Sequence, residues 1–147
     1  MTATNHVLTG AVLAAAYPNP LVVLPAALVS HVILDALPHY GHEDHTDRKF
    51  LYVLAVDFAI ASSFLLSVSF LRPEHWLLII AASVVAASPD ALWLPHWLRE
   101  ITGKPGKAKS KLETFLARIQ WAEKPWGWIF EIPWAIAAFV LFVNLSH

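Results

Sequence analysis

Four acidic residues lie inside apolar stretches of this chain: Asp35, Asp57, Asp90 and Glu131. None of the ten Lys and Arg residues lies inside those stretches. A carboxylate in hydrocarbon costs about 2.5–3.5 kcal/mol on insertion scales, so such residues are usually paired and functional. Because no cationic side chain is expected at the same depth, the counter-charge should be protons or a bound metal ion. The presence of His6 and His31 in the same pattern favours metal.

The sharpest local motif is His31-x3-Asp35. Residues four apart share one face of a helix, so this spacing aims an imidazole nitrogen and a carboxylate oxygen at one point. An isolated pair of this kind also fits a hydrogen bond between helices. His39 continues the same spacing, but Pro38 should end the helix before it. His39 is therefore either a metal ligand from the loop or a histidine at the membrane interface.

The composition indicates an integral membrane protein with one domain. The chain has 147 residues, of which 57% are hydrophobic and 14% are charged, and its mean hydropathy is +0.54. This balance is too apolar for a soluble domain of that size. The net charge of −1 and the scattered basic residues give no reason to expect a nucleic-acid partner, and the lack of cysteine excludes disulfides and thiolate metal sites.

Prolines and charged residues divide the chain into apolar segments that we expect to be helical. They cover residues 6–17, 21–37, 50–71, 76–98 and 126–145. The first is about 18 Å long as a helix, which is short for a span, so it either spans or re-enters. Pro89 should kink the fourth segment beside Asp90. The predicted fold is an all-α membrane bundle of four to six helices, including the short N-terminal helix.

The segment between the last two apolar stretches, residues 99–124, holds seven of the ten basic residues. Within it, apolar residues recur at helical spacing: Leu112, Phe115, Leu116 and Ile119. This pattern predicts a short amphipathic helix on the membrane surface. A solvated linker helix that docks on the other helices fits the pattern equally well.

The distribution of basic residues predicts how the chain crosses the membrane. The loops at 38–49 and 99–124 should lie on one side with nine basic residues, and Arg72 alone lies on the other. The positive-inside rule makes both loops cytoplasmic, in a multi-pass protein of the cell (inner) membrane. Asp57 and Asp90 would then lie about 12 Å inside the cytoplasmic side, and Glu131 about 7 Å. The acidic residues and the two histidines thus fall in one shallow layer.

A shared metal centre would explain that layer. Four ionised carboxylates carry the charge that two divalent ions neutralise, so one or two ions per chain are expected. Mixed His and carboxylate ligands suit Zn, Mn or Fe(II), with Zn preferred. A two-metal centre activates water and clamps a phosphoryl group. At headgroup depth it would face membrane lipid and phosphate-containing or lipid-linked substrates.

Three stretches carry a resemblance to a known family. They are the HVLTG motif at 6–10, the Pro-Asn-Pro turn at 18–20 and SHVILDALPH at 30–39, and Ser88-Pro89-Asp90 matches more loosely. Together they resemble small bacterial and archaeal membrane proteins known as membrane-bound metal-dependent hydrolases. The resemblance covers roughly the first 45 residues, and the HRGxTHS-like segment of larger relatives is missing here. It implies a helical membrane fold and metal-assisted hydrolysis, with His6, His31, Asp35 and Asp90 as ligands.

We therefore expect a membrane-embedded metal-dependent hydrolase. Asp57 and Glu131 would complete a second metal position or act as general base, because burial raises the pKa of a free carboxyl. A protein that moves protons or metal ions across the membrane is an alternative, although a path across the bilayer should place polar groups in both leaflets. A non-catalytic membrane scaffold is another. The sequence leaves the oligomeric state open.

Overall fold

The computed structural model describes residues 1–41, 47–106 and 108–146 of the chain. Over these residues it contains seven α-helices: α1 (Ala3–Ala16), α2 (Pro20–Asp35), α3 (Arg48–Leu71), α4 (Trp76–Ala87), α5 (Leu94–Ile101), α6 (Lys111–Ile119) and α7 (Trp128–Leu145). Two short 3-10 helices, η1 (Ser88–Leu92) and η2 (Gln120–Ala122), and two strands of two residues, β1 (His39–Tyr40) and β2 (Glu123–Lys124), complete the described elements. The all-α prediction is confirmed. Residues 42–46 of the predicted loop 38–49, and Lys107 of the basic segment, lie outside the described residues.

The described helices outnumber the predicted four to six because the segment expected at 76–98 is divided. Helix α4 ends at Ala87, η1 follows with Pro89 in its first turn, and α5 begins at Leu94 with Pro95 in its first turn. A proline has no N–H to give to the preceding turn, which favours a new helix start at each position. The α4–η1 run and α5 are bent by 46° relative to each other. The kink predicted at Pro89 is thus a change of helix type beside Asp90.

Helix α1 is the centre of the bundle and packs against α2, α3, α4 and α7. Its contact with α4 is very close, because a Cβ built on Gly10 would lie 2.5 Å from the carbonyl oxygen of Ala82. Small residues let helix backbones approach in this way, and Ala11, Ala14 and Ala82 are fully buried here. The N-terminal segment, expected to begin at His6, begins at Ala3 and serves as the core of the fold.

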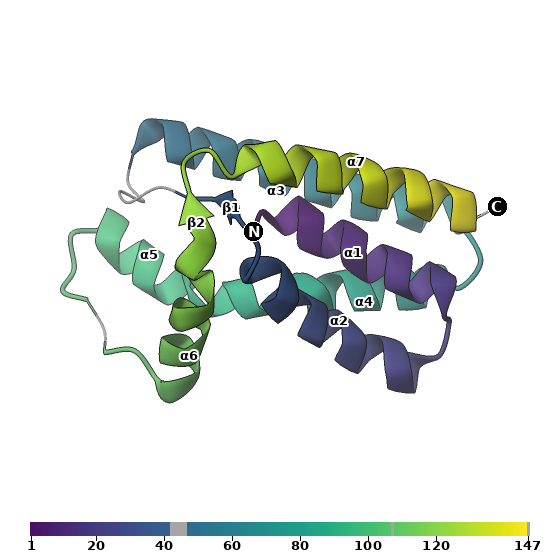
Figure 1. Ribbon diagram of the computed structural model, residues 1–147, viewed down its shortest axis with the longest axis horizontal. Helices are drawn as coiled ribbons and strands as arrows, with labels where there is room; N and C mark the ends of the chain where they lie inside the picture. The colour runs from purple at the N-terminus through teal and green to yellow at the C-terminus, as the bar shows by residue number, and fades with distance from the viewer. Residues whose placement is uncertain (42–46, 107, 147) are drawn as a thin grey trace.

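A two-stranded parallel pairing closes one end of the bundle and was missed from the sequence. His39 pairs with Glu123 and Tyr40 with Lys124. Gly127 permits this approach, because a Cβ there would lie 1.9 Å from the carbonyl carbon of His39. The pairing joins the loop after α2 to the segment before α7. Figure 1 shows β1, β2, α5, α6 and the N-terminus at the same end, with the C-terminus at the other.

Helices α3 and α7 are long and apolar enough to cross a membrane, and the bent α4–η1 and α5 pair would be a third span if counted as one. Helix α2 is apolar but shorter. Bulky apolar side chains point outward from α3, among them Phe58 at 69% and Phe70 at 83% exposure. By length and composition the described residues therefore contain two, or up to three, candidate spans.

Candidate metal centre

Four predicted ligands come together at the end of the bundle that holds the N-terminus. His6 of α1, His31 and Asp35 of α2 and Asp90 of η1 each offer one ligand atom, and these atoms all lie within 4.8 Å of one another. His6, His31 and Asp35 are buried, whereas Asp90 has a side chain that is 35% exposed. Because they come from three elements, tertiary packing rather than local sequence makes the group. With four ligand atoms from two histidines and two aspartates, the group could hold a metal ion.

The orientation of His31 is fixed by a backbone carbonyl. Its Nδ1 lies 2.8 Å from the carbonyl oxygen of Ala86, and since a carbonyl can only accept, Nδ1 carries the proton and donates. The other nitrogen, Nε2, lies 3.2 Å from Oδ2 of Asp35 and 3.7 Å from Oδ1 of Asp90. A lone pair on Nε2 would repel both carboxylates. A proton, on the ring or on one of the carboxyl groups, or a metal ion between these atoms removes that repulsion.

His6 adds a second imidazole whose polar atoms are poorly satisfied. Its ring stacks on that of His31 with centroids 4.1 Å apart, and Nε2 lies 3.2 Å from Oδ1 of Asp35 and 3.9 Å from Oδ2 of Asp90. Neither ring nitrogen has a hydrogen bond of acceptable geometry to the described residues. A buried polar group without a partner costs about 1–3 kcal/mol. Two stacked imidazolium rings would repel each other, so we expect at most one of the two rings to carry a full positive charge.

Asp35 has neighbours that the sequence did not reveal. The amino group of Met1 lies 2.6 Å from Oδ1 of Asp35, and the two groups form a buried ion pair. The expectation that no cation of the protein lies at this depth was therefore wrong, since only side chains had been considered. The side-chain amide of Gln120 in η2 donates to Oδ2 of Asp35 at 3.3 Å. The ion pair supplies part of the counter-charge that the sequence assigned to metal.

Asp57 and Glu131 do not join the group of four, although both are buried near the same end. Asp57 accepts from the backbone N–H of Ala3 at 2.7 Å and of Thr4 at 3.1 Å. Glu131 accepts from the backbone N–H of Thr2 at 2.9 Å. The first N–H groups of a helix lack partners within it and carry partial positive charge. These two carboxylates, from α3 and α7, therefore fix the start of α1, and with it the position of His6.

His39 also lies outside the group of four, so the structure does not support the interpretation of this residue as a ligand. It is buried in β1, and its Nδ1 donates to the carbonyl oxygen of Leu37 at 2.8 Å. Burial, and next the positive amino group of Met1, lower the pKa of His39 below its usual 6.5. Because α2 ends at Asp35, His39 does not continue the helical face that carries His31 and Asp35.

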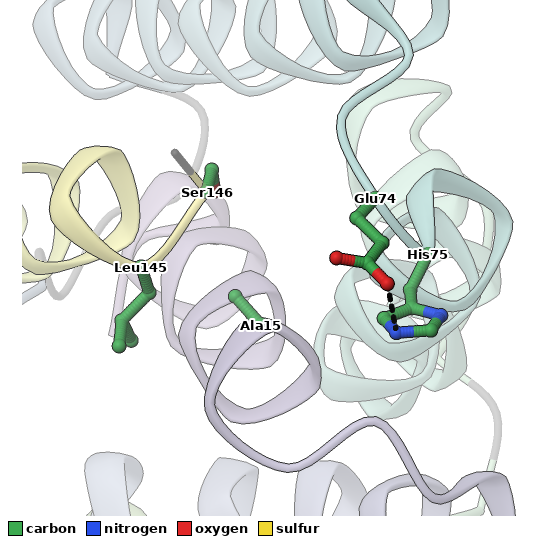
Figure 2. A pocket seen from close by; sticks show the side chains of 5 residues that line it. All are labelled: Ala15, Glu74, His75, Leu145 and Ser146. Carbon is green, nitrogen blue, oxygen red and sulfur yellow. Dashed lines mark ion pairs between the residues drawn. The ribbon is translucent and has the colours of Figure 1, made fainter.

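Two hollows of the described part of the chain lie away from this group, and both include His75 in their lining. One cavity of about 100 Å³ is lined by Ala15, Glu74, His75, Leu145 and Ser146 (Figure 2). His75 there points toward Glu74, with Nε2 3.3 Å from Oε1. Because Ala15 and Leu145 belong to the last turns of α1 and α7, this cavity is at the opposite end from His6 and Glu131. His75 therefore takes no part in the candidate centre.

Three contributors to the centre were missed from the sequence: the carbonyl of Ala86, the amide of Gln120 and the amino group of Met1. A backbone carbonyl and a terminal amine leave no signal in residue type. Gln120 directly follows the predicted amphipathic helix, but nothing in its spacing relates it to Asp35. The tiny β1–β2 pairing, which also went unpredicted, brings η2 to this end of the bundle.

The arrangement offers two imidazole nitrogens and two carboxylates to one point, with Asp90 as its most exposed member. These are donor types that divalent cations take in proteins, and the exposure of Asp90 leaves an approach from its side. The chain matches no protein-family model, no curated protein and no solved structure.

Proposed function

We propose that this protein is a membrane-embedded, metal-dependent hydrolase. One observation carries the proposal: the Nε2 atom of His31, fixed by the Ala86 carbonyl, faces oxygens of both Asp35 and Asp90. A metal ion between these three atoms would satisfy all of them, and the second imidazole of His6 provides a further metal-type donor beside them. The resemblance of the first 45 residues to membrane-bound metal-dependent hydrolases agrees with this proposal.

The donor set favours one ion. His6, His31, Asp35 and Asp90 supply four ligand atoms, and Zn²⁺ is the ion that we assign, with Mn²⁺ and Fe²⁺ as competitors of similar ligand preference. These residues would hold the ion, and the chemistry that it would supply there is a lowered pKa of a bound water molecule and polarisation of a carbonyl or phosphoryl oxygen. A second ion is less well supported, because Asp57 and Glu131 accept hydrogen bonds from the start of α1. We therefore assign these two residues to positioning His6.

The length and composition of helices α3 and α7 and their outward apolar side chains support a membrane location. We propose a multi-pass protein of the cell membrane whose basic segment 99–124 lies in the cytoplasm with the candidate centre. At this depth the reacting bond would be at the headgroup layer, which fits a phosphoester or lipid-linked substrate. The more exposed side chain of Asp90 marks the side from which the substrate approaches.

Elemental analysis of the purified protein and an assay of phosphodiester hydrolysis test the proposal together. We expect about one divalent ion per chain, with loss of the ion in His31→Ala and Asp35→Ala. His75→Ala is the matched control, because His75 pairs with Glu74 at the opposite end. The assay uses bis(p-nitrophenyl) phosphate with the metal-loaded protein in detergent. Folded protein that binds no divalent ion, or that binds one without hydrolysing any phosphoester or lipid-linked substrate, contradicts the proposal.

A non-catalytic scaffold is the second candidate, and a specific observation favours it. The Met1 amino group pairs with Asp35, while Asp57 and Glu131 hold the start of α1. In this reading the carboxylates connect α2, α3 and α7 to α1 and need no metal. Metal-free protein with an unchanged unfolding temperature would favour the scaffold, whereas metal-dependent stability would favour the hydrolase.

A further inference from the structure

Helix α6 presents apolar side chains on its outward face. Leu112 and Phe115 are 55% and 54% exposed, whereas Glu113 and Leu116 are buried against the rest of the protein. Residues three apart lie on the same side of a helix, so Leu112 and Phe115 form one outward strip. The apolar residues that predicted this helix therefore do not all face the same way: Leu116 packs inward, whereas Leu112 and Phe115 face outward.

Basic side chains flank this outward strip. Lys111 and Arg118 are exposed and lie four residues before and three residues after Phe115, on the same face of the helix. The whole segment 99–124 contains seven basic residues against three acidic ones. Long basic side chains place their methylene groups along apolar surface and their charge at the level of lipid phosphates. The outward face of α6 thus combines apolar residues with positive charge.

The direction of α6 fits a membrane surface. Helices α3 and α7 run along the long axis of the molecule, whereas α6 runs across that direction at the end that holds β2 and the N-terminus (Figure 1). If α3 and α7 cross the bilayer, α6 lies parallel to its plane. Amphipathic helices that bind membranes take this orientation, with their apolar face at the boundary between headgroups and acyl chains.

Contacts on the inner side fix which face of α6 points outward. The Ser110 side chain and Glu113 form a capping box, and Oε1 of Glu113 lies 2.8 Å from Nε2 of His96 in α5. Gln120, directly after α6, donates to Asp35. With Glu113 and Leu116 held inward, Leu112 and Phe115 cannot turn away from the solvent side without breaking these contacts.

We propose that the outward face of α6, formed by Lys111, Leu112, Phe115 and Arg118, binds the anionic headgroup layer of the membrane in which the protein sits. This inference rests on the proposed membrane location of α3 and α7. Its apolar residues enter the boundary of the acyl chains, and its basic residues attract anionic lipids. The face thereby holds η2, which follows α6, at a defined level beside the candidate centre.

Single cysteines offer a direct test, because the chain has none of its own. Spin labels at Phe115→Cys, Thr114→Cys and Phe58→Cys are compared after reconstitution into phosphatidylcholine with or without phosphatidylglycerol. Phe58 is exposed on α3 and reports whether that helix is in lipid. Thr114 is exposed on α6 beside the outward strip and is the polar control. Accessibility to oxygen reports lipid, and accessibility to a neutral nickel chelate reports water.

We expect the Phe58 label in lipid in both membranes and the Phe115 label in lipid chiefly when phosphatidylglycerol is present. Arg118→Gln should reduce the effect of phosphatidylglycerol at Phe115 several-fold, whereas Arg72→Gln, at the other end of α3, should leave it unchanged. A Phe115 label in water while Phe58 is in lipid overturns the surface proposal alone. A Phe58 label in water overturns the membrane location and the surface proposal together. Spin–spin broadening at Phe115 that is independent of lipid charge identifies a second copy as the occupant and also overturns the proposal.

Discussion

The Nδ1–H of His31 donates to the carbonyl oxygen of Ala86 across the α2–α4 contact, at 2.8 Å. This bond selects the tautomer of His31 and turns its Nε2 toward Asp35 and Asp90. Backbone groups commonly orient metal-binding histidines in this way. Because Ala86 is fully buried one residue before the end of α4, the packing of α4 determines how the candidate centre is presented.

Asp90→Asn should remove hydrolysis while the protein stays folded. The side chain of Asp90 is the most exposed of the four, so its replacement by a neutral side chain of the same shape disturbs packing little. The loss of one anionic ligand should reduce phosphodiester hydrolysis by at least about 100-fold. Hydrolysis assays and thermal unfolding in detergent measure the two effects. Retained hydrolysis would exclude Asp90 from the reaction.

Gln120→Leu should weaken metal binding without removing it. The Gln120 amide orients Asp35 through Oδ2, and the loss of such a supporting hydrogen bond typically costs about 10–100-fold in metal affinity. Competition with a chelator of known affinity measures the change. Trp121→Leu is the neighbouring control, because Trp121 is 73% exposed. Equal effects of both substitutions would indicate a general disturbance of η2.

Gly10→Ala should destabilise the protein through the α1–α4 contact. The added Cβ would lie 2.5 Å from the Ala82 carbonyl oxygen, which is backbone and cannot move alone. Overpacking of this kind costs about 1–3 kcal/mol. Gly106→Ala is the control, because a Cβ there meets nothing within 4 Å. Thermal unfolding should show a lower midpoint for Gly10→Ala only.

The sequence allowed the group of four to be predicted because the family resemblance points to these residues, whereas the expected depth alone groups them with Asp57 and Glu131. His31 and Asp35 share a helix face, and Pro89 marks the break at Asp90. The roles of Asp57 and Glu131 could not be predicted in the same way. Their partners are backbone N–H groups of residues 2–4, and a backbone group has no distinctive residue type. His39 lies outside the group of four because the helix ends at Asp35 and the chain then pairs with β2.

Asp57→Ala should loosen the start of α1, whereas Asp57→Asn should do so less. The carboxylate accepts from the N–H groups of Ala3 and Thr4, which Ala would leave without these acceptors. Loss of a helix cap typically costs about 0.5–2 kcal/mol, and unpaired buried groups add to this. The Asn side chain keeps one oxygen acceptor. Amide hydrogen exchange at residues 3 and 4 should increase in the order wild type, Asn, Ala, with Ser67→Ala on the exposed side of α3 as control.

The stability of α6 should depend on pH through Glu113. The backbone N–H of Ser110 chiefly, then its side chain and the His96 ring, lower the pKa of Glu113 to about 2, from the usual 4.5. Because this pKa is lowered in the folded protein, the ionised Glu113 carboxylate stabilises α6. That stabilisation is complete above about pH 4.5 and is lost as the pH falls toward about 2. Amide exchange of α6 in the folded protein should therefore accelerate over that range beyond the intrinsic effect of pH. In Glu113→Gln the additional acceleration should be absent, and its persistence would show that another group controls the opening of α6.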